Sequence, residues 1–265
     1  MLGLLSKIIL AAVVGCTLVA CLIYFKQETL IFHPQRLSAN HSFSFPAPFE
    51  ERFIQSGQVK LHSLRFPKTD SQGVILYFHG NAGSLESWGH VASDFRSTPY
   101  DIWVVDYRGY GKSEGSISGE SGLHDDAEAL HEAAKALYPG KDIIIYGRSI
   151  GTGIAAKLAA KHPPKLLILE TPYFNFPDLV SQIAPWAPTP LLRYRLMTNE
   201  YIADASFPVH LIHGDRDGLI PMSSSEELAG LGDHIVFHKV EGAEHNNISA
   251  FRRYHQIIRD LLGRG

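Results

Sequence analysis

One serine in the sequence stands where a nucleophile would be exposed. Residues 147–151 read Gly-Arg-Ser-Ile-Gly, between a short apolar run at 143–146 and an alanine-rich helical stretch at 150–161. A strand that turns sharply into a helix presents the residue at the apex of the turn, and flanking glycines leave room for it. The first amides of the helix also favour negative charge nearby. We therefore predict that Ser149 is a catalytic nucleophile; the alternative is an ordinary turn between a strand and a helix.

A serine hydroxyl is a weak nucleophile at neutral pH and needs a base beside it. His245 lies in a glycine-flanked loop after the last apolar run, 235–240. The run before it, 209–212, is followed by His-Gly-Asp-Arg-Asp, which contains Asp215 and Asp217. We predict His245 as the base. We predict Asp217 as its acidic partner, because the position four residues after His213 is where such a loop bends back. Asp215 is the alternative, and the aspartate without a catalytic role would cap amides of the turn.

The chemistry open to a serine, a histidine and a carboxylate is acyl transfer, which creates an oxyanion that needs N–H donors. A glycine-rich turn at 79–84, His-Gly-Asn-Ala-Gly-Ser, follows the apolar run at 74–78. We predict that the backbone N–H groups of Asn81, in this turn, and of Ile150, next to the nucleophile, form an oxyanion hole. The alternative is a turn without a catalytic role.

Short apolar runs and helical stretches alternate along the chain. Strands are predicted at 53–55, 59–66, 74–78, 102–105, 143–146, 166–169, 209–212 and 235–240, the first two as a hairpin. Helices are predicted at 85–95, 123–137, 150–161, 222–231 and 248–262. This alternation favours an α/β fold with a mostly parallel sheet covered by helices on both faces, and ligand chemistry at the carboxyl ends of the strands.

The chain divides by composition into three parts. Residues 1–26 form an apolar N-terminal segment, residues 27–50 a linker, and residues 51–265 the enzyme-like domain. Within that domain, 173–206 breaks the alternation and contains four prolines. We predict that it forms a small cap over the site, helical near 178–183 and 191–197.

The N-terminal segment contains 18 uncharged residues, 8–25, flanked by lysines. A helix of that length spans about 27 Å, close to the thickness of the hydrocarbon core of a bilayer. We predict a single membrane anchor with the body outside the cytoplasm. Two alternatives remain open: a lipoprotein signal with Cys16 or Cys21 as the modified residue, and a cleaved secretory signal.

The overall composition limits the classes of partner and cofactor. A net charge of −3 gives no basic excess with which to neutralise phosphates, so we expect no nucleic-acid partner. Both cysteines lie in the N-terminal segment, so the body has no disulfide or cysteine-based metal site. His124, Asp125 and Asp126 are consecutive on a helix and cannot converge on one ion. We expect no metal and no organic cofactor.

Five motifs occur in one order along the chain and together resemble those of the α/β-hydrolase superfamily. They are His79-Gly80-Asn81-Ala82-Gly83, the run from Asp106 to Gly115, the turn at Ser149, His213-Gly214 with Asp217, and Gly242 with His245. The chain is similar in particular to membrane-anchored abhydrolase-domain (ABHD) and acylaminoacyl-peptidase-like proteins. The resemblance implies an eight-stranded sheet, a triad of Ser149, His245 and Asp217, and no cofactor. The segment 173–206 matches no substrate-defining pattern of the family.

We therefore expect a serine hydrolase that cleaves an ester or thioester with an acyl or lipid-like group, through an acyl-enzyme. A peptidase or acylaminoacyl-peptide hydrolase would use the same triad. A membrane-tethered binding protein without activity is the alternative from another class. The expected partners are a small-molecule or acyl substrate and, through the N-terminal segment, a membrane.

Overall fold

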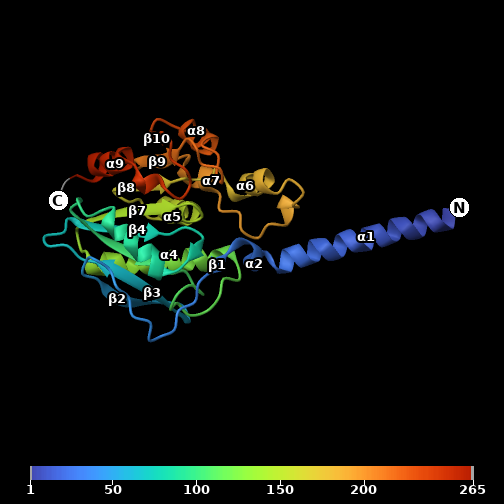
Figure 1. Cartoon of the computed structure of the whole chain (residues 1–265), viewed down its shortest axis with the longest axis horizontal. Coiled ribbons are helices and arrows are strands. Elements are labelled where there is room, and N and C mark those ends of the chain that lie inside the picture. Colours follow the sequence, from blue (N-terminus) through green and yellow to red (C-terminus); the bar gives the residue numbers. More distant parts are fainter. Residues whose placement is uncertain (1, 264–265) are drawn as a thin grey trace.

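A computed structural model describes residues 2–263 of the chain, apart from the side chains of Leu2 and Cys16. Within these residues an eight-stranded sheet has the order β10-β9-β8-β7-β4-β6-β3-β2 (Figure 1). The strands are β2 Glu50–Ser56, β3 Val59–Phe66, β4 Gly73–Phe78, β6 Tyr100–Val105, β7 Asp142–Arg148, β8 Leu166–Glu170, β9 Val209–Gly214 and β10 Ile235–Val240. Among these strands, only the pairs β2–β3 and β3–β6 are antiparallel, which confirms the predicted hairpin and the mostly parallel sheet.

Helices cover both faces of the sheet, as the sequence predicted. They are α3 Leu85–Trp88, α4 Glu120–Leu137, α5 Gly151–Lys161, α8 Ser223–Ala229 and α9 Arg252–Leu262. On β4, Leu76 belongs to the core cluster that contains residues of α4 and α5, whereas Ile75 belongs to the cluster that contains residues of α9. Successive side chains of a strand point to opposite faces, so both faces of β4 are buried and the whole strand is apolar.

Two predicted helices differ from the structure. The stretch 85–95 is one α-helical turn, α3, followed by a 3-10 helix at Gly89–Ser93. The helix predicted at 191–197 is wrong: a 3-10 helix covers Thr189–Leu191, and α7 begins only at Thr198. The amides of Arg195 and Leu196 instead donate to the carboxylate of Glu120, on α4. These two amides therefore have hydrogen-bond partners without the chain being helical.

The other predicted helix of this segment is present as α6, Phe176–Ile183. The side chain of Asn175 caps it by accepting a hydrogen bond from the Asp178 amide, at 2.9 Å. A side-chain cap of this kind satisfies one of the N–H groups that the first helical turn leaves without a partner. The domain boundaries themselves, including 173–206 as a cap, remain predictions.

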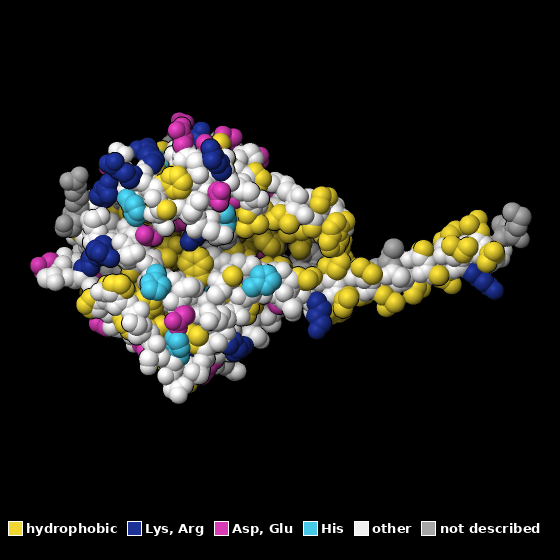
Figure 2. All heavy atoms as spheres, in the orientation of Figure 1, with side chains coloured by type: hydrophobic (Ala, Val, Ile, Leu, Met, Phe, Trp, Pro, Cys, Tyr) yellow, Lys and Arg dark blue, Asp and Glu magenta, His cyan; other side chains and the backbone are white. Residues whose placement is uncertain are grey.

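The N-terminal residues form a long helix, α1 Leu2–Phe25, that projects from the body (Figure 1). Hydrophobic side chains lie along it (Figure 2). In the described part of the chain it is the one helix long and apolar enough to cross a membrane. Cys21 is exposed on α1, whereas the Cys16 side chain, which the lipoprotein hypothesis also invokes, lies outside the described residues.

The predicted linker is more ordered than its composition indicated. It contains a short helix, α2 Gln27–Ile31, and a two-residue strand, β1 His33–Pro34. β1 pairs in parallel with β5, Ala82–Gly83, in the glycine-rich turn after β4. The linker therefore reaches the predicted oxyanion turn.

Candidate active site

The structure brings the three predicted triad residues together. The Ser149 hydroxyl is placed to donate to His245 Nε2, at 3.0 Å. His245 Nδ1 is placed to donate to Asp217 Oδ2, at 2.7 Å. Ser149 follows β7, Asp217 follows β9 and His245 follows β10. The carboxyl ends of these parallel strands share one edge of the sheet, which is why residues so far apart in sequence meet there.

The turn at Ser149 depends on the glycines beside it. Ser149 has a φ of 51°, a left-handed conformation that is strained for a residue with a side chain. A Cβ atom on Gly147 would lie 2.6 Å from the Gly151 carbonyl oxygen, and one on Gly151 would lie 2.3 Å from that of Phe78. The Ser149 amide donates to the Glu170 carbonyl, on β8, at 2.9 Å. Tight packing on both sides therefore holds the serine in its strained conformation.

Asp217 is held as an anion by the groups around it. Its side chain is buried, and its Oδ1 accepts hydrogen bonds from the amides of Leu219 and Ile220, each at 2.9 Å. Burial would raise the pKa of this carboxyl, but hydrogen bonds from His213, His245 and the Ile220 amide lower it well below its usual value. A carboxylate that stays charged can fix the orientation of the His245 imidazole.

Asp215, the alternative acid, lies outside this arrangement. Its Oδ1 accepts a hydrogen bond from the Gly242 amide at 2.7 Å, and its Oδ2 lies 3.3 Å from Lys239 Nζ. It caps an amide of the neighbouring loop, the role expected for the aspartate without a catalytic role.

A second histidine contacts the same carboxylate, and sequence reasoning missed it. The Nε2 atom of His213 lies 3.2 Å from Asp217 Oδ2 and 2.9 Å from the Ile220 carbonyl oxygen, so it is a donor. Its Nδ1 accepts from the Ser225 hydroxyl at 2.7 Å, and the ring is fully buried. The sequence pattern identifies His213 only as the start of a turn. Its position at the end of an apolar strand, next to a glycine, was the signal that could have identified a buried polar contact.

The two predicted oxyanion donors border the same space as Ser149. Asn81 and Ile150 line one cavity together with the serine. A Cβ on Gly80 would lie 3.7 Å from the Ser149 Cβ, so the turn after β4 approaches Ser149 closely. The buried Tyr173 hydroxyl donates to the Ile150 carbonyl at 3.1 Å, which fixes the start of α5.

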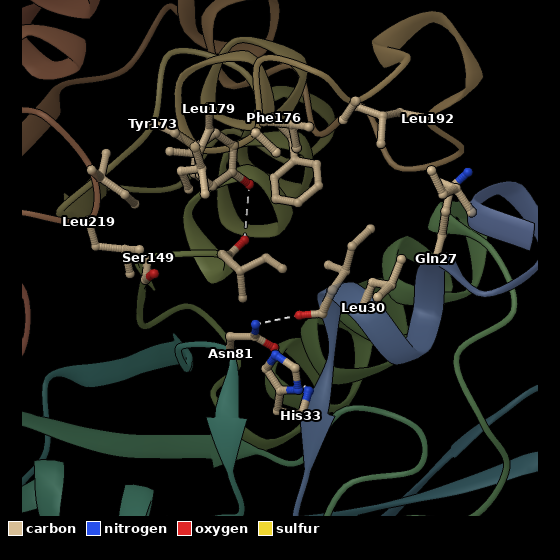
Figure 3. A pocket seen from close by; sticks show the side chains of 18 of the residues that line it. Gln27, Leu30, His33, Asn81, Ser149, Tyr173, Phe176, Leu179, Leu192 and Leu219 are labelled. Atoms are coloured by element: carbon tan, nitrogen blue, oxygen red, sulfur yellow. Dashed lines mark hydrogen bonds between the residues drawn. The ribbon is translucent and has the colours of Figure 1, made fainter. Parts of the chain in front are cut away.

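The Asn81 side chain ties this turn to the N-terminal segment. Its Oδ1 accepts hydrogen bonds from the His33 amide at 3.3 Å and the Tyr110 hydroxyl at 3.2 Å. Its Nδ2 donates to the Ile31 carbonyl, as Figure 3 shows. These contacts join α2 and β1 to the loop that would stabilise the oxyanion.

A cavity of about 340 Å³ extends from Ser149. Its wall is mostly apolar: Phe176, Leu179 and Leu192 point into it from one side and Leu30 from the other (Figure 3). The sequence predicts that Ser149, Asn81 and Ile150 lie close together, as they do in this cavity, but it does not predict the contribution of α2. A space of this size and lining suits an extended apolar group more than a polar one.

Arg148 lies beneath the site and connects its parts. Its Nε is 3.0 Å from Glu170 Oε1, and its terminal nitrogen donates to the His245 carbonyl at 3.1 Å. The guanidinium also lies over the Trp88 ring, 5.0 Å from its centre. Arg148 therefore supports the loop that carries His245 without contacting the cavity.

Among residues 2–263, one group of side chains offers ligand atoms close enough for a metal ion: His131, Glu132 and His162, within 4.8 Å of one another. His162 already bonds Glu128, at 2.6 Å, and follows the end of α5 opposite to Ser149. An ion there would not touch the triad. Of the residues at 124–126, Asp126 accepts a hydrogen bond from Arg108 and His124 contacts Glu120.

Comparisons with known proteins agree with this fold. A family model described as Serine aminopeptidase, S33 matches residues 69–201. The protein bem46 of Schizosaccharomyces pombe is 26% identical over 95% of this chain and 91% of its own length. The lysophosphatidylserine lipase ABHD12 of Danio rerio is 32% identical over 72% of this chain, which covers 58% of that relative. The esterase Pf2001 of Pyrococcus furiosus, at 18% identity, superposes with a TM-score of 0.69 over 88% of this chain and 96% of its own.

Proposed function

We infer the function of this chain from its family: it belongs to the α/β-hydrolase superfamily and, within it, to the family described as Serine aminopeptidase, S33. We propose that it is a serine hydrolase that cleaves an ester or thioester of an acyl chain. One observation carries the proposal. The hydrogen-bonded series Ser149–His245–Asp217 ends at a hydroxyl that lines an apolar cavity.

The geometry supports a two-step acyl transfer. His245 Nε2 takes the hydroxyl proton as Ser149 Oγ attacks the substrate carbonyl carbon, and the oxyanion is stabilised by the amides of Asn81 and Ile150. His245 then gives the proton to the leaving alcohol or thiol, and an acyl-enzyme remains. A water molecule, deprotonated by the same imidazole, attacks the acyl carbon and releases the acid and the free serine.

The cavity favours an acyl substrate over an amino-terminal peptide. Recognition of a free amine calls for a carboxylate, and the described cavity lining contains none. The curated relative from Danio rerio is described as a lysophosphatidylserine lipase, which supports an acyl ester for this chain as well. The family description favours the second candidate, a peptidase with the same triad.

The test is labelling by a fluorophosphonate and hydrolysis of matched substrates. We expect the probe to label the wild type and not Ser149→Ala, and Ser149→Ala to lower kcat by up to about 10⁶-fold. Ser93→Ala, at an exposed serine on the 3-10 helix after α3, is the matched control and should keep both properties.

Turnover of a long-chain ester, the corresponding thioester and an aminoacyl amide then separates the two candidates. A preference for the amide would replace the acyl-ester proposal with the peptidase. Labelling that persists in Ser149→Ala would contradict both.

A further inference from the structure

We propose that the rim of the cavity docks into the surface of a lipid bilayer beside α1, and that an acyl chain passes from the lipid leaflet directly into the cavity. This inference rests on the proposed function, and it names the surface from which the substrate comes. Three independent features of the described residues support it.

The first feature is an exposed apolar rim. Trp186 is 78% exposed and Ile183 is 57% exposed, and both also line the cavity. Leu30, on α2, and Leu219, in the loop after β9, are exposed and line it as well. Figure 2 shows hydrophobic side chains gathered on the side of the body from which α1 leaves. Large side chains of this kind are costly to leave in water, so their clustering around one opening indicates an apolar surface that covers them.

The second feature is the position of α1 relative to the opening. Ile23, in the last turn of α1, lines the cavity together with Gln27 and Leu30. Tyr24 lies beneath the Arg193 guanidinium, 5.4 Å from the ring centre to the Arg193 Cζ, and Lys26 follows the helix. Aromatic and basic residues at the end of an apolar helix are typical of the boundary between a bilayer and water. If α1 crosses the bilayer, this boundary lies at the level of the opening.

The third feature is a set of hydrogen bonds that joins the rim to the foot of α1. Gln27 is 2% exposed; its Nε2 donates to the Leu191 carbonyl at 2.8 Å, and its Oε1 accepts from the Arg193 amide at 2.9 Å. The Tyr194 hydroxyl donates to Glu28 Oε1 at 2.7 Å. The segment that carries Ile183 and Trp186 is therefore fixed to the residues that follow α1. A membrane-inserted α1 would hold this part of the rim against the lipid surface.

These features identify the occupant as the bilayer. The rim is continuous with a helix whose own exposed surface is apolar, so the same lipid phase covers both. An acyl chain moving along Ile23 and Leu30 would reach Ser149 without passing through water. A substrate carrying an acyl chain and a polar head group at the lipid surface fits this path.

The test uses tryptophan fluorescence of the full chain in liposomes whose lipids carry bromine on their acyl chains. The protein contains three tryptophans, of which Trp103 is buried in the core. We expect brominated lipids to quench the emission, and Trp186→Phe to remove most of the quenched component. Equal fractional quenching in the wild type and in Trp186→Phe would overturn the proposal. So would an emission that acrylamide quenches from water and brominated lipid does not, which would favour a protein partner.

A second measurement links the rim to substrate entry. For the double variant Ile183→Ser, Trp186→Ser, we expect the ratio of turnover on a bilayer-embedded acyl ester to turnover on a short water-soluble ester to fall about tenfold. Phe53→Ser, a 58% exposed aromatic on β2 far along the sheet, is the matched control and should keep the wild-type ratio. An unchanged ratio in the double variant would overturn the proposed path.

The outcomes separate this proposal from the proposed function. Ser149→Ala should retain lipid quenching in full. Quenching without any ester hydrolysis by the wild type would contradict the hydrolase proposal and leave the docking surface. Hydrolysis without quenching would contradict the docking surface and leave the hydrolase proposal.

Discussion

The two sides of the cavity are built in different ways. The proposed catalytic side consists of loops that follow β7, β9 and β10, and its polar groups bond one another at 2.7 to 3.2 Å. The opposite side comes from α2 and from residues 173–206, is mostly apolar, and contains short helices with irregular chain between them. The sheet fixes the first side, because each loop starts from a strand end. Contacts between distant segments fix the second.

This difference suggests a division of labour. The catalytic side needs groups held within hydrogen-bond distance, which a rigid sheet edge provides. The apolar side needs only volume and surface, so it tolerates irregular structure as long as it stays attached. Changes on the catalytic side should therefore lower turnover on every substrate, and changes on the apolar side should act mainly on substrates presented by a membrane.

Asp217→Asn tests the proposed catalytic side and should change turnover more than any change on the apolar side. The amide would offer a donor where His245 Nδ1–H needs an acceptor, so the imidazole would lose its orientation and its stabilisation when protonated. We expect kcat on a soluble ester to fall by about 10⁴-fold, with lipid quenching of Trp186 unchanged. Asp215→Asn, two residues earlier, is the control and should stay within a few fold of the wild type. Similar losses in both variants would remove the distinction between the triad and its supporting loop.

Gln27→Ala tests the attachment of the apolar side. It removes the side-chain partners of the Leu191 carbonyl and the Arg193 amide, two partly buried hydrogen bonds that contribute about 0.5–1.5 kcal/mol each. We expect turnover on a bilayer-embedded ester to fall about tenfold and turnover on a soluble ester to fall less, because the triad is untouched. Gln55→Ala, on the exposed hairpin, is the control. An equal loss on both substrates would mean that the two sides are coupled more tightly than their construction indicates.

The same division explains what could be predicted from the sequence. Buried parallel strands are apolar throughout, so their positions and the loops at their ends were visible as short runs. From those loops followed the placement of Ser149, Asp217 and His245, which the structure brings together. Their catalytic roles and the roles of the Asn81 and Ile150 amides remain proposals.

The parts that could not be predicted depend on contacts far apart in the chain. The chain at 191–197 is not helical because Glu120, some 75 residues away, binds its amides. The linker becomes ordered because β1 pairs with the turn after β4. Neither partner is visible in a local pattern of hydrophobic and polar residues, and His213 was missed for the same reason: its partners Ser225 and Asp217 are defined only by the folded loop.

The smallest expected effect separates pH dependence of the fold from pH dependence of the site. β9 carries Asp217 beyond its carboxyl end and His210 near its amino end, where His210 Nδ1 lies 2.8 Å from His238 Nε2 on β10. Burial, with a smaller contribution from the charge of His238, lowers the pKa of His210 to about 4. In the unfolded chain His210 has an ordinary pKa and binds a proton once the pH falls below 6.5. In the folded protein it binds that proton only at a lower pH.

Because the unfolded state binds more protons in this range, the free energy of unfolding should be fully retained above pH 6.5 and should fall as the pH drops toward 4. Solvent still reaches the pair, so we expect a loss of only about 1 kcal/mol from His210 between pH 7 and pH 5. Urea unfolding at the two pH values measures it, and His210→Gln should reduce the loss by that amount while His90→Gln, at an exposed histidine, should not. His210→Gln should leave the pH profile of ester hydrolysis as in the wild type. His210 lies near the amino end of β9, whereas the triad lies beyond the carboxyl ends of the strands. A shifted activity profile in that variant would show that the two ends of β9 are linked electrostatically and that the catalytic side is not set by its own loops alone.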